Sequence, residues 1–388
     1  MANSKRIPLS VPYLKGNEAK YAKECVDSGW VSSAGPWVDR FEREFARYLG
    51  VSDAVSMTSG SAALHVALLC SGVEAGDIVL VPTLTFIASV NSIHYAGAHP
   101  VFIDCDESLN IDPAATLRFL REECDFRGGV LTHRKSGRRV RAIMPVHIFG
   151  HPASLGTILE AAEEFSLRVI EDATESLGSV YSEGKRPTGT IGHIGCFSFN
   201  GNKIITTGGG GMLVSRDPAI VAKARYLSTQ AKDDPLFYVH DEVGYNYRLT
   251  SVQAAIGIAQ LEVLPKILET KRKNFAAYGR LLKDAGIAGH LIGEPADTHS
   301  NHWLYTLLFD RPIELRTVIE KLQERGIEAR PVWKLNHLQK PYREEVAYDI
   351  SRAEQLYPRL LNIPSSADLE AEDVARVVDA LREVLALR

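Results

Sequence analysis

The sequence has few cysteines, and their arrangement gives no sign of a disulfide framework or a zinc site. Five cysteines, an odd number, occur among 388 residues, and no two of them form a Cys-x-x-Cys pair. Disulfide-rich secreted domains and structural zinc sites both need cysteines at short, paired spacings. This usage favours a chain that folds in a reducing compartment, so we expect a cytoplasmic protein without a metal site.

The sequence also lacks long apolar runs and a strong excess of charge. No stretch of about 18 apolar residues is present, so we expect no helix that crosses a membrane, and the N-terminal segment carries no apolar signal core. With a formal net charge of −4, the chain lacks the positive overall charge typical of nucleic-acid-binding proteins. The basic run at residues 133–141 is interpreted as a solvated hairpin or loop. We therefore expect neither nucleic acid nor membrane as a partner.

Short β-rich runs alternate with helical patterns over the first 250 residues. Candidate strands lie at 54–57, 78–81, 101–103, 142–146, 168–170, 196–199 and 211–215, with helix-like stretches such as 61–70 and 154–165 between them. This alternation predicts an α/β fold with a mostly parallel central sheet and helices on both faces. Ligands of such sheets bind beyond the carboxyl ends of the strands, so the residues that follow each strand are the candidates for a site.

The pattern changes after residue 250. Helical patterns cover 250–264 and 267–282, and a strand-like piece at 303–309 is followed by helical patterns at 315–325 and 371–387. We predict a large α/β domain with an N-terminal segment at residues 1–250. Residues 251–388 are predicted to form a linking helix and a smaller α+β domain.

A single lysine, Lys203, stands shortly before four consecutive glycines at 208–211. A P-loop requires the pattern Gly-x-x-x-x-Gly-Lys-Ser/Thr, whose backbone N–H groups surround a phosphate. Here an asparagine separates Gly201 from Lys203, and Ile204 takes the place of the Ser or Thr. The pattern therefore argues against a P-loop and leaves two interpretations, an exposed turn lysine or a reactive amine.

Three further features are expected at the same edge of the sheet. Asp172 ends the run 168–172, where it caps a turn or holds a positive charge on a ligand. Gly60 and Ser61 open a helix after a strand, which either is ordinary capping or provides free N–H groups for a phosphate. Phe86 follows another strand and is either a core side chain or an aromatic surface for a ligand.

Taken together, these features match the requirements of pyridoxal phosphate. The phosphate needs a helix N-terminus, the ring needs an aromatic neighbour, the protonated ring nitrogen needs a carboxylate, and the aldehyde needs a lysine. The combination is far more specific than any of its members.

The sequence resembles the DegT/DnrJ/EryC1/StrS sugar aminotransferases over nearly its whole length. The resemblance rests on motifs in the family's order, at residues 27–36, 59–65, 82–86, 145–150, 171–176, 198–211 and 244–249. It implies the aspartate-aminotransferase-like architecture of fold type I. It also implies a homodimer with shared active sites, and pyridoxal 5'-phosphate as the cofactor, with pyridoxamine phosphate as an intermediate form.

The resemblance assigns roles to individual residues. Lys203 is the lysine that forms the imine with the cofactor, and Asp172 pairs with the ring nitrogen. Further cofactor contacts are assigned to Gly60, Ser61, Phe86, Glu175, Ser198 and Asn246. Of these, Asn246 reaches the phosphate of the neighbouring subunit, and Glu175 stands where the family often has glutamine. Arg248, Arg330, Trp333 and His337 are expected either to line the sugar-nucleotide cleft or to pack between domains or subunits.

Within the family the chain looks closest to the branch that makes 4-amino sugars of the bacillosamine and legionaminic acid type, on residues 102–106, 200–207, 228–231 and 328–334. That resemblance implies transfer from L-glutamate to the C4 ketone of a nucleotide-linked 2-acetamido-4-keto-2,4,6-trideoxyhexose, with UDP favoured over GDP or dTDP. The alternatives are a 3-aminotransferase acting on a 3-keto nucleotide sugar and a non-catalytic regulator that binds pyridoxal phosphate or a nucleotide sugar. A 3-dehydratase of the same family is disfavoured, because that reaction is associated with a histidine at the position of Lys203.

Overall fold

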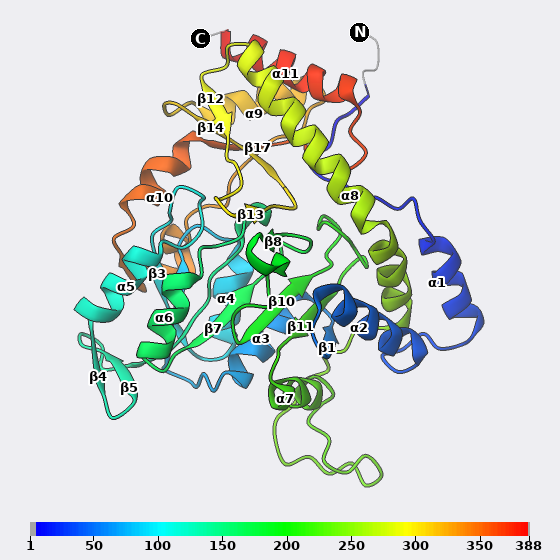
Figure 1. The fold of residues 1–388 in the computed structure, drawn as a ribbon, viewed down its shortest axis with the longest axis vertical. Coiled ribbons are helices and arrows are strands. Elements are labelled where there is room, and N and C mark those ends of the chain that lie inside the picture. Colours follow the sequence, from blue (N-terminus) through cyan, green and yellow to red (C-terminus); the bar gives the residue numbers. More distant parts are fainter. Residues whose placement is uncertain (1–4, 387–388) are drawn as a thin grey trace.

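A ten-stranded mixed sheet forms the centre of the computed structural model, which describes residues 5–386 (Figure 1). Its main path runs β1 (Ala54–Met57), β11 (Gly211–Val214), β10 (Ile194–Ser198), β7 (Arg168–Asp172), β6 (Arg139–Ile143), β2 (Ile78–Pro82), β3 (His99–Ile103) and β16 (Val346–Tyr348). The strands from β10 to β16 pair in parallel, whereas β11 is antiparallel to both of its neighbours. The hairpin of β4 (Cys124–Arg127) and β5 (Val130–His133) joins the sheet through β6. The predicted, mostly parallel sheet is confirmed.

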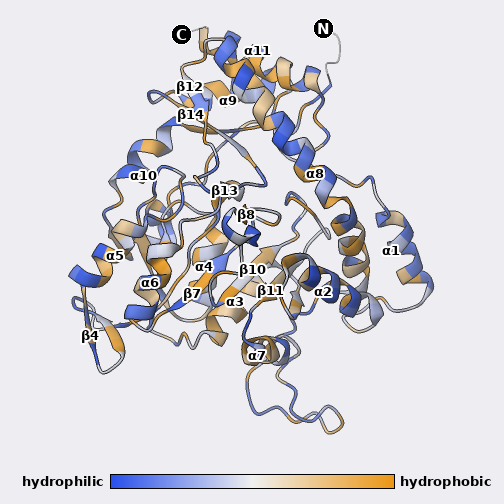
Figure 2. Cartoon of the chain, in the orientation of Figure 1, coloured by the Kyte–Doolittle hydropathy of each residue, from blue (hydrophilic) through white to orange (hydrophobic). Residues whose placement is uncertain are grey.

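Helices cover both faces of this sheet, because the apolar side chains of strands such as β2 point alternately to one face and the other. Val79 and Val81 share a core with α3 (Gly60–Cys70), α4 (Ile87–Tyr95) and α7 (Pro218–Ser228). Ile78 and Leu80 point the other way, into a core with α5 (Pro113–Glu122) and α6 (Gly156–Glu164). Because side chains alternate between the faces of a strand, a strand buried on both faces reads as a continuous apolar run. Figure 2 shows the apolar colours gathered in this interior.

Strand β6 differs from the predicted strand at 142–146. It begins earlier, at Arg139, where it pairs with β5, and it ends at Ile143. Pro145 has no N–H to donate, which interrupts the ladder. Pairing resumes only as an isolated bridge between Val146 and Asp172.

The two helical stretches predicted between 250 and 282 form a single helix, α8 (Ser251–Asp284), which continues through Pro265. Its first half packs on α1 (Glu18–Asp27) and α2 (Pro36–Leu49), and its second half contacts α11 (Ala371–Ala386). In Figure 1 the helix runs from the large sheet to the end of the molecule where both termini lie. Because α8 contributes to the cores on both sides, a domain boundary at residue 250 stays a prediction.

The C-terminal part contains a four-stranded antiparallel sheet. Its strand order is β12 (Gly289–Leu291), β14 (Tyr305–Phe309), β17 (Leu360–Ile363) and β15 (Arg330–Pro331). Helices α9 (Leu315–Glu324) and α11 share a core with this sheet. The helix predicted at 371–387 corresponds to α11, and Leu387 lies outside the described residues. The remaining elements are the short sheet of β13 (Thr298–His299), β8 (Val180–Tyr181) and β9 (Arg186–Pro187), and helix α10 (Ser351–Leu356).

Among the helices between residues 5 and 386, none combines the length and the apolar character needed to cross a bilayer. Over the same residues, no three His, Cys, Asp or Glu side chains are grouped so that they could hold a metal ion.

Candidate active site

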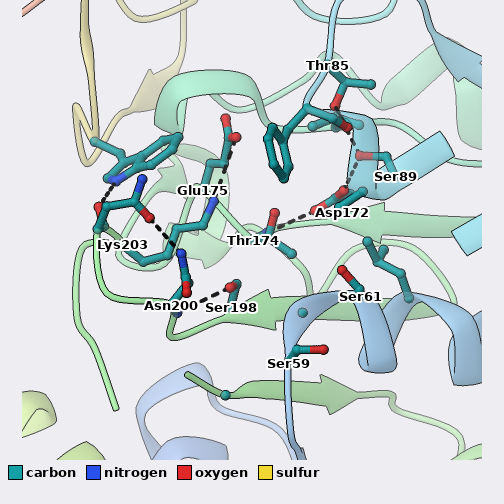
Figure 3. Close-up of a pocket in the computed structure, with 18 of the residues that line it drawn as sticks. Ser59, Ser61, Thr85, Ser89, Asp172, Thr174, Glu175, Ser198, Asn200 and Lys203 are labelled. Carbon is teal, nitrogen blue, oxygen red and sulfur yellow. Dashed lines mark hydrogen bonds and ion pairs between the residues drawn. The ribbon is translucent and has the colours of Figure 1, made fainter. Parts of the chain in front are cut away.

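A cavity opens at the carboxyl ends of β7 and β10, beside the N-terminus of α3 (Figure 3). Eight of the predicted site residues line it: Gly60, Ser61, Phe86, Asp172, Glu175, Ser198, Lys203 and Trp333. They come from segments far apart in the sequence, and the parallel sheet brings them together because its strands end at a common edge.

The N-terminus of α3 forms one wall of the cavity. Ser59 caps the helix, and its Oγ accepts a hydrogen bond from the N–H of Ala62 at 3.0 Å. A Cβ placed on Gly60 would lie 2.9 Å from Cβ of Ser198 and 3.1 Å from Cγ2 of Thr174. Glycine therefore lets the helix start lie against β10, with the hydroxyl of Ser198 close to the first N–H groups. Such a start is a ready-made site for an anionic group such as a phosphate.

Substitution of Gly60 by alanine is expected to weaken cofactor binding by about tenfold or more, since roughly 1.4 kcal/mol of lost contact gives that factor. The added methyl group must displace Ser198 or the helix start. The dissociation constant of pyridoxal phosphate, measured by spectroscopic titration, checks this. Gly279→Ala is the matched control, because a Cβ at Gly279 meets nothing within 4 Å. Equal affinity in the two variants would contradict phosphate binding at the start of α3.

Asp172 is the last residue of β7 and is buried, with 1% of its surface exposed. Ser89 Oγ donates a hydrogen bond to Oδ2 at 2.7 Å, and the N–H of Thr174 donates to Oδ1 at 3.1 Å. Ser89 in turn lies 3.0 Å from the hydroxyl of Thr85. The carboxylate is therefore held in one orientation at the cavity wall. Sequence reasoning missed Ser89; its only signal was its position one turn into the helix that follows Phe86.

Lys203 and Glu175 point toward each other across the cavity (Figure 3). Nζ of Lys203 lies 3.7 Å from Oε1 of Glu175, and the two side chains are 11% and 2% exposed. Burial lowers the pKa of Lys203, and the charges of Glu175 and Asp172 oppose that change. Burial raises the pKa of Glu175 to about 7, against the opposing effect of Lys203. The cavity thus favours a neutral amine on Lys203, which a nucleophile or a base requires. The alternative of an exposed turn lysine is wrong.

Trp303 supports Lys203 and was not expected from the sequence. Nζ of Lys203 lies 4.1 Å from the centre of the indole ring, within the range of a cation–π contact. The indole Nε1 donates a hydrogen bond at 2.6 Å to the carbonyl of Asn202, the residue before Lys203. Trp303 therefore contacts both the amine and the backbone that carries it. No local pattern around Trp303 indicates this role.

Phe86 faces the cavity and is not a core residue. Its side chain is 45% exposed, and its ring lies 5.1 Å from that of Trp333 at an interplanar angle of 61°. Trp333 also lies 6.0 Å from Phe149 and 6.4 Å from Trp303, measured between ring centres. These rings provide an aromatic wall against which a flat ligand ring can pack.

Four of the predicted residues do not line the cavity within one chain. Asn246 is exposed and bridges to Thr229, and Arg330 is exposed in β15. Arg248 lies beside β1. Its Nη1 is 2.7 Å from Oε1 of Glu42 and donates a hydrogen bond at 3.2 Å to the carbonyl of Ser56. His337 Nδ1 lies 2.7 Å from Thr83 Oγ1, and its Nε2 lies 3.5 Å from Glu354. Their predicted roles stay predictions.

The geometry of the cavity agrees with the comparisons to known proteins. The model of the DegT/DnrJ/EryC1/StrS aminotransferase family matches residues 12–382. The chain belongs to this family. Membership makes it a pyridoxal phosphate-dependent aminotransferase that acts on nucleotide sugars, and confirms the cofactor predicted from the sequence.

Known relatives cover nearly the whole chain. EpsN of Bacillus subtilis (strain 168), whose name places it among pyridoxal phosphate-dependent aminotransferases, is 40% identical over 97% of this chain and 95% of its own length. A GDP-perosamine synthase of Caulobacter vibrioides is 39% identical over 99% of this chain and 100% of its own. The crystal structure of the aminotransferase TlmJ from Streptoalloteichus hindustanus matches this structure with a TM-score of 0.87 and 28% sequence identity. The match covers 99% of this chain and 100% of the TlmJ chain. The predicted fold type I architecture is confirmed.

Proposed function

We propose that this enzyme transfers the amino group of L-glutamate to the C4 ketone of a UDP-linked 2-acetamido-4-keto-2,4,6-trideoxyhexose. The product is a 4-amino sugar for surface glycan biosynthesis. The observation that carries amino transfer is the position of Lys203, whose amine lies in one cavity with Asp172 and the start of α3. The motifs at 102–106, 200–207, 228–231 and 328–334 support the choice of sugar.

The residues of the cavity have different roles in this reaction. Pyridoxal phosphate, when bound, supplies the carbonyl that carries the amino group and a ring that takes up electrons. Gly60, Ser61 and Ser198 hold its phosphate, and Phe86 packs on its ring. Asp172, fixed by two hydrogen-bond donors, pairs with the ring nitrogen.

Lys203 moves the proton that each half of the reaction requires. It takes a proton from the amino-acid carbon in the first half and returns one to the sugar carbon in the second. A base of this kind needs a pKa near the working pH, and burial lowers the pKa of Lys203 in that direction.

A GDP-linked 4-keto sugar is the second candidate substrate. The Caulobacter relative, 39% identical over 99% of this chain, is named for a GDP-linked product. The two candidates share the proposed chemistry and differ in the nucleotide that the enzyme must recognise.

A panel of nucleotide-linked keto sugars tests the proposal. The purified enzyme is supplied with glutamate and with UDP-, GDP- or dTDP-linked 4-keto sugars, and the amino sugars are quantified by mass spectrometry. We expect kcat/KM to be highest for the UDP-linked acetamido sugar, by at least about tenfold, since an unmatched polar group disfavours the wrong ligand by that much or more. The highest value for a GDP sugar would establish the second candidate, and failure to aminate any of them would refute both.

We also propose a cytoplasmic homodimer with shared active sites. All five cysteines are free thiols, as a reducing cytoplasm would keep them. The segment between α7 and α8 exposes Leu236, Phe237, Tyr238 and Val243 by 72–81%. It projects below α7 in Figure 1 and also carries Asn246. Exposed apolar clusters of this kind are typical of protein interfaces. Light scattering of the purified protein measures the mass, and a monomer would contradict this proposal.

A further inference from the structure

Two hydrogen bonds hold Glu175, one at its carboxylate and one at its backbone carbonyl, and the second carboxylate oxygen faces Lys203. Its Oε2 accepts a hydrogen bond from the N–H of Phe149 at 2.7 Å. Its backbone carbonyl accepts one from Nδ2 of Asn301 at 3.0 Å. The remaining oxygen, Oε1, lies 3.7 Å from Nζ of Lys203. The side chain therefore has little freedom, and its orientation toward the lysine is set by the protein.

The backbone that fixes Glu175 is itself in an unusual conformation. Phe149 has φ 54° and ψ 13°, in the left-handed region that residues other than glycine seldom occupy. Such a conformation is unfavourable for a residue with a side chain and persists only where the surrounding structure holds it. At this position it accompanies an N–H that points at the Glu175 carboxylate, so the turn is organised around that group.

The surroundings bring the proton affinities of the two groups toward each other. The charged groups that face Glu175 are Lys203 and Asp172, and the indole of Trp333 is an uncharged side chain that acts to lower its pKa. Lys203 is faced by Glu175 and Asp172. Burial acts in opposite directions on the pair, lowering the pKa of the amine and raising that of the Glu175 carboxyl to about 7. Burial therefore narrows the gap between the two proton affinities, while the opposite charges of the two groups still stabilise each other.

We propose that Glu175 is a positioning residue that shares one proton with Lys203. In the exchange an N–H bond of the Lys203 ammonium breaks and an O–H bond forms on Oε1 of Glu175. The freed lone pair of Nζ is then available in the cavity. The 3.7 Å separation closes by movement of the lysine terminus, as catalytic hydrogen bonds often tighten on ligand binding. This inference deepens the proposed function and rests on the role of Lys203 in it.

Chemical labelling of Lys203 tests the inference directly. Acetic anhydride reacts with neutral amines, so its rate at Lys203, followed by peptide mass spectrometry across a pH series, reports the protonation of that amine. The full-length protein is labelled both with and without bound pyridoxamine phosphate. In Glu175→Gln we expect the midpoint of labelling to fall by about one pH unit or more, because an opposite charge at this distance holds the proton on the amine.

Two further variants separate proton sharing from the effect of simply removing one negative charge from the protein. Glu175→Asp keeps the carboxyl group and is expected to stay closer to the wild-type midpoint than Glu175→Gln. Glu269→Gln makes the same change of charge at an exposed position on α8 and is expected to leave the midpoint unchanged. Glutamine still offers an oxygen to the N–H of Phe149, and a thermal melt checks that Glu175→Gln is folded.

Identical labelling profiles for wild type and folded Glu175→Gln would overturn the inference, since a residue that serves only the cofactor or the fold leaves the amine unchanged. This outcome is distinct from failure of the proposed function. If the wild-type enzyme aminates none of the sugars but Glu175→Gln shifts the labelling midpoint, the proposed function is refuted and the proton sharing stands. If the wild-type enzyme aminates a sugar and the midpoint does not shift, the function stands and the proton sharing is refuted.

Discussion

Replacement of Lys203 by alanine is expected to abolish amino transfer, with a fall in kcat of at least about 10⁴-fold, the upper range for loss of a general base. Two functions are expected to disappear together, because in the proposed reaction the same amine both forms the covalent link to the cofactor and moves the proton. The cavity offers no substitute: Glu175 has no amine, and the ring of Trp303 cannot accept the proton. Release of 2-oxoglutarate from glutamate, measured without any sugar, isolates the first half of the reaction.

Two controls sharpen this result. Lys203→Arg keeps a positive charge, but its guanidinium is not deprotonated in proteins, so it is expected to be as inactive as the alanine variant. Lys273→Ala removes a lysine that is 73% exposed and paired with Glu269, and should retain full activity. Turnover by Lys203→Ala at more than a few per cent of the wild-type rate would show that another group is the base.

Substitution of Asp172 by asparagine is expected to lower the rate of both half-reactions by about 10²- to 10³-fold, the loss typical of one electrostatic contact in a buried site. The amide keeps the size of the side chain and an oxygen for the Ser89 hydroxyl. It removes the negative charge that would keep the cofactor ring nitrogen protonated. Single-turnover rates with glutamate, and separately with the sugar, measure the two steps.

Ser89→Ala provides the matched comparison. It leaves the charge of Asp172 in place and removes the hydrogen bond to Oδ2. We expect a loss of about tenfold, in line with a hydrogen bond to a charged group. Similar losses in the two variants would indicate that Asp172 acts through its orientation rather than its charge, and unchanged rates in Asp172→Asn would remove it from the mechanism.

Much of the fold and part of the site were predictable because they depend on local patterns. Strands such as β2 are short apolar runs, and strands that run in the same direction, such as β1 and β7, have their carboxyl ends at the same edge of the sheet. Asp172 and the start of α3 could therefore be placed at one edge from the sequence. That α8 is a single helix was harder to predict from the sequence, because Pro265 suggests a break that tertiary packing overrides.

Other parts of the site depend on contacts between distant segments. Trp303 binds the backbone of Asn202 across 101 residues of sequence, and Ser89 reaches Asp172 across 83. No periodicity connects such pairs, so the local pattern gave no reason to name Trp303 or Ser89. Likewise, the sequence left open whether Arg248 lines the substrate cleft or packs between domains or subunits, and its ion pair with Glu42 is visible only in the folded chain.

The sequence by itself determined the chemistry of this protein, because a lysine, a carboxylate and a helix start at successive strand ends leave few alternatives to an amine-transferring cofactor enzyme. Only the tertiary structure decided the environment in which that lysine works. Its burial beside Trp303, and its pairing with a carboxylate oxygen of Glu175 that the strained turn at Phe149 leaves free, depend on how distant segments pack. The proton affinity of an amine is set by such neighbours, and these are fixed only when the chain folds.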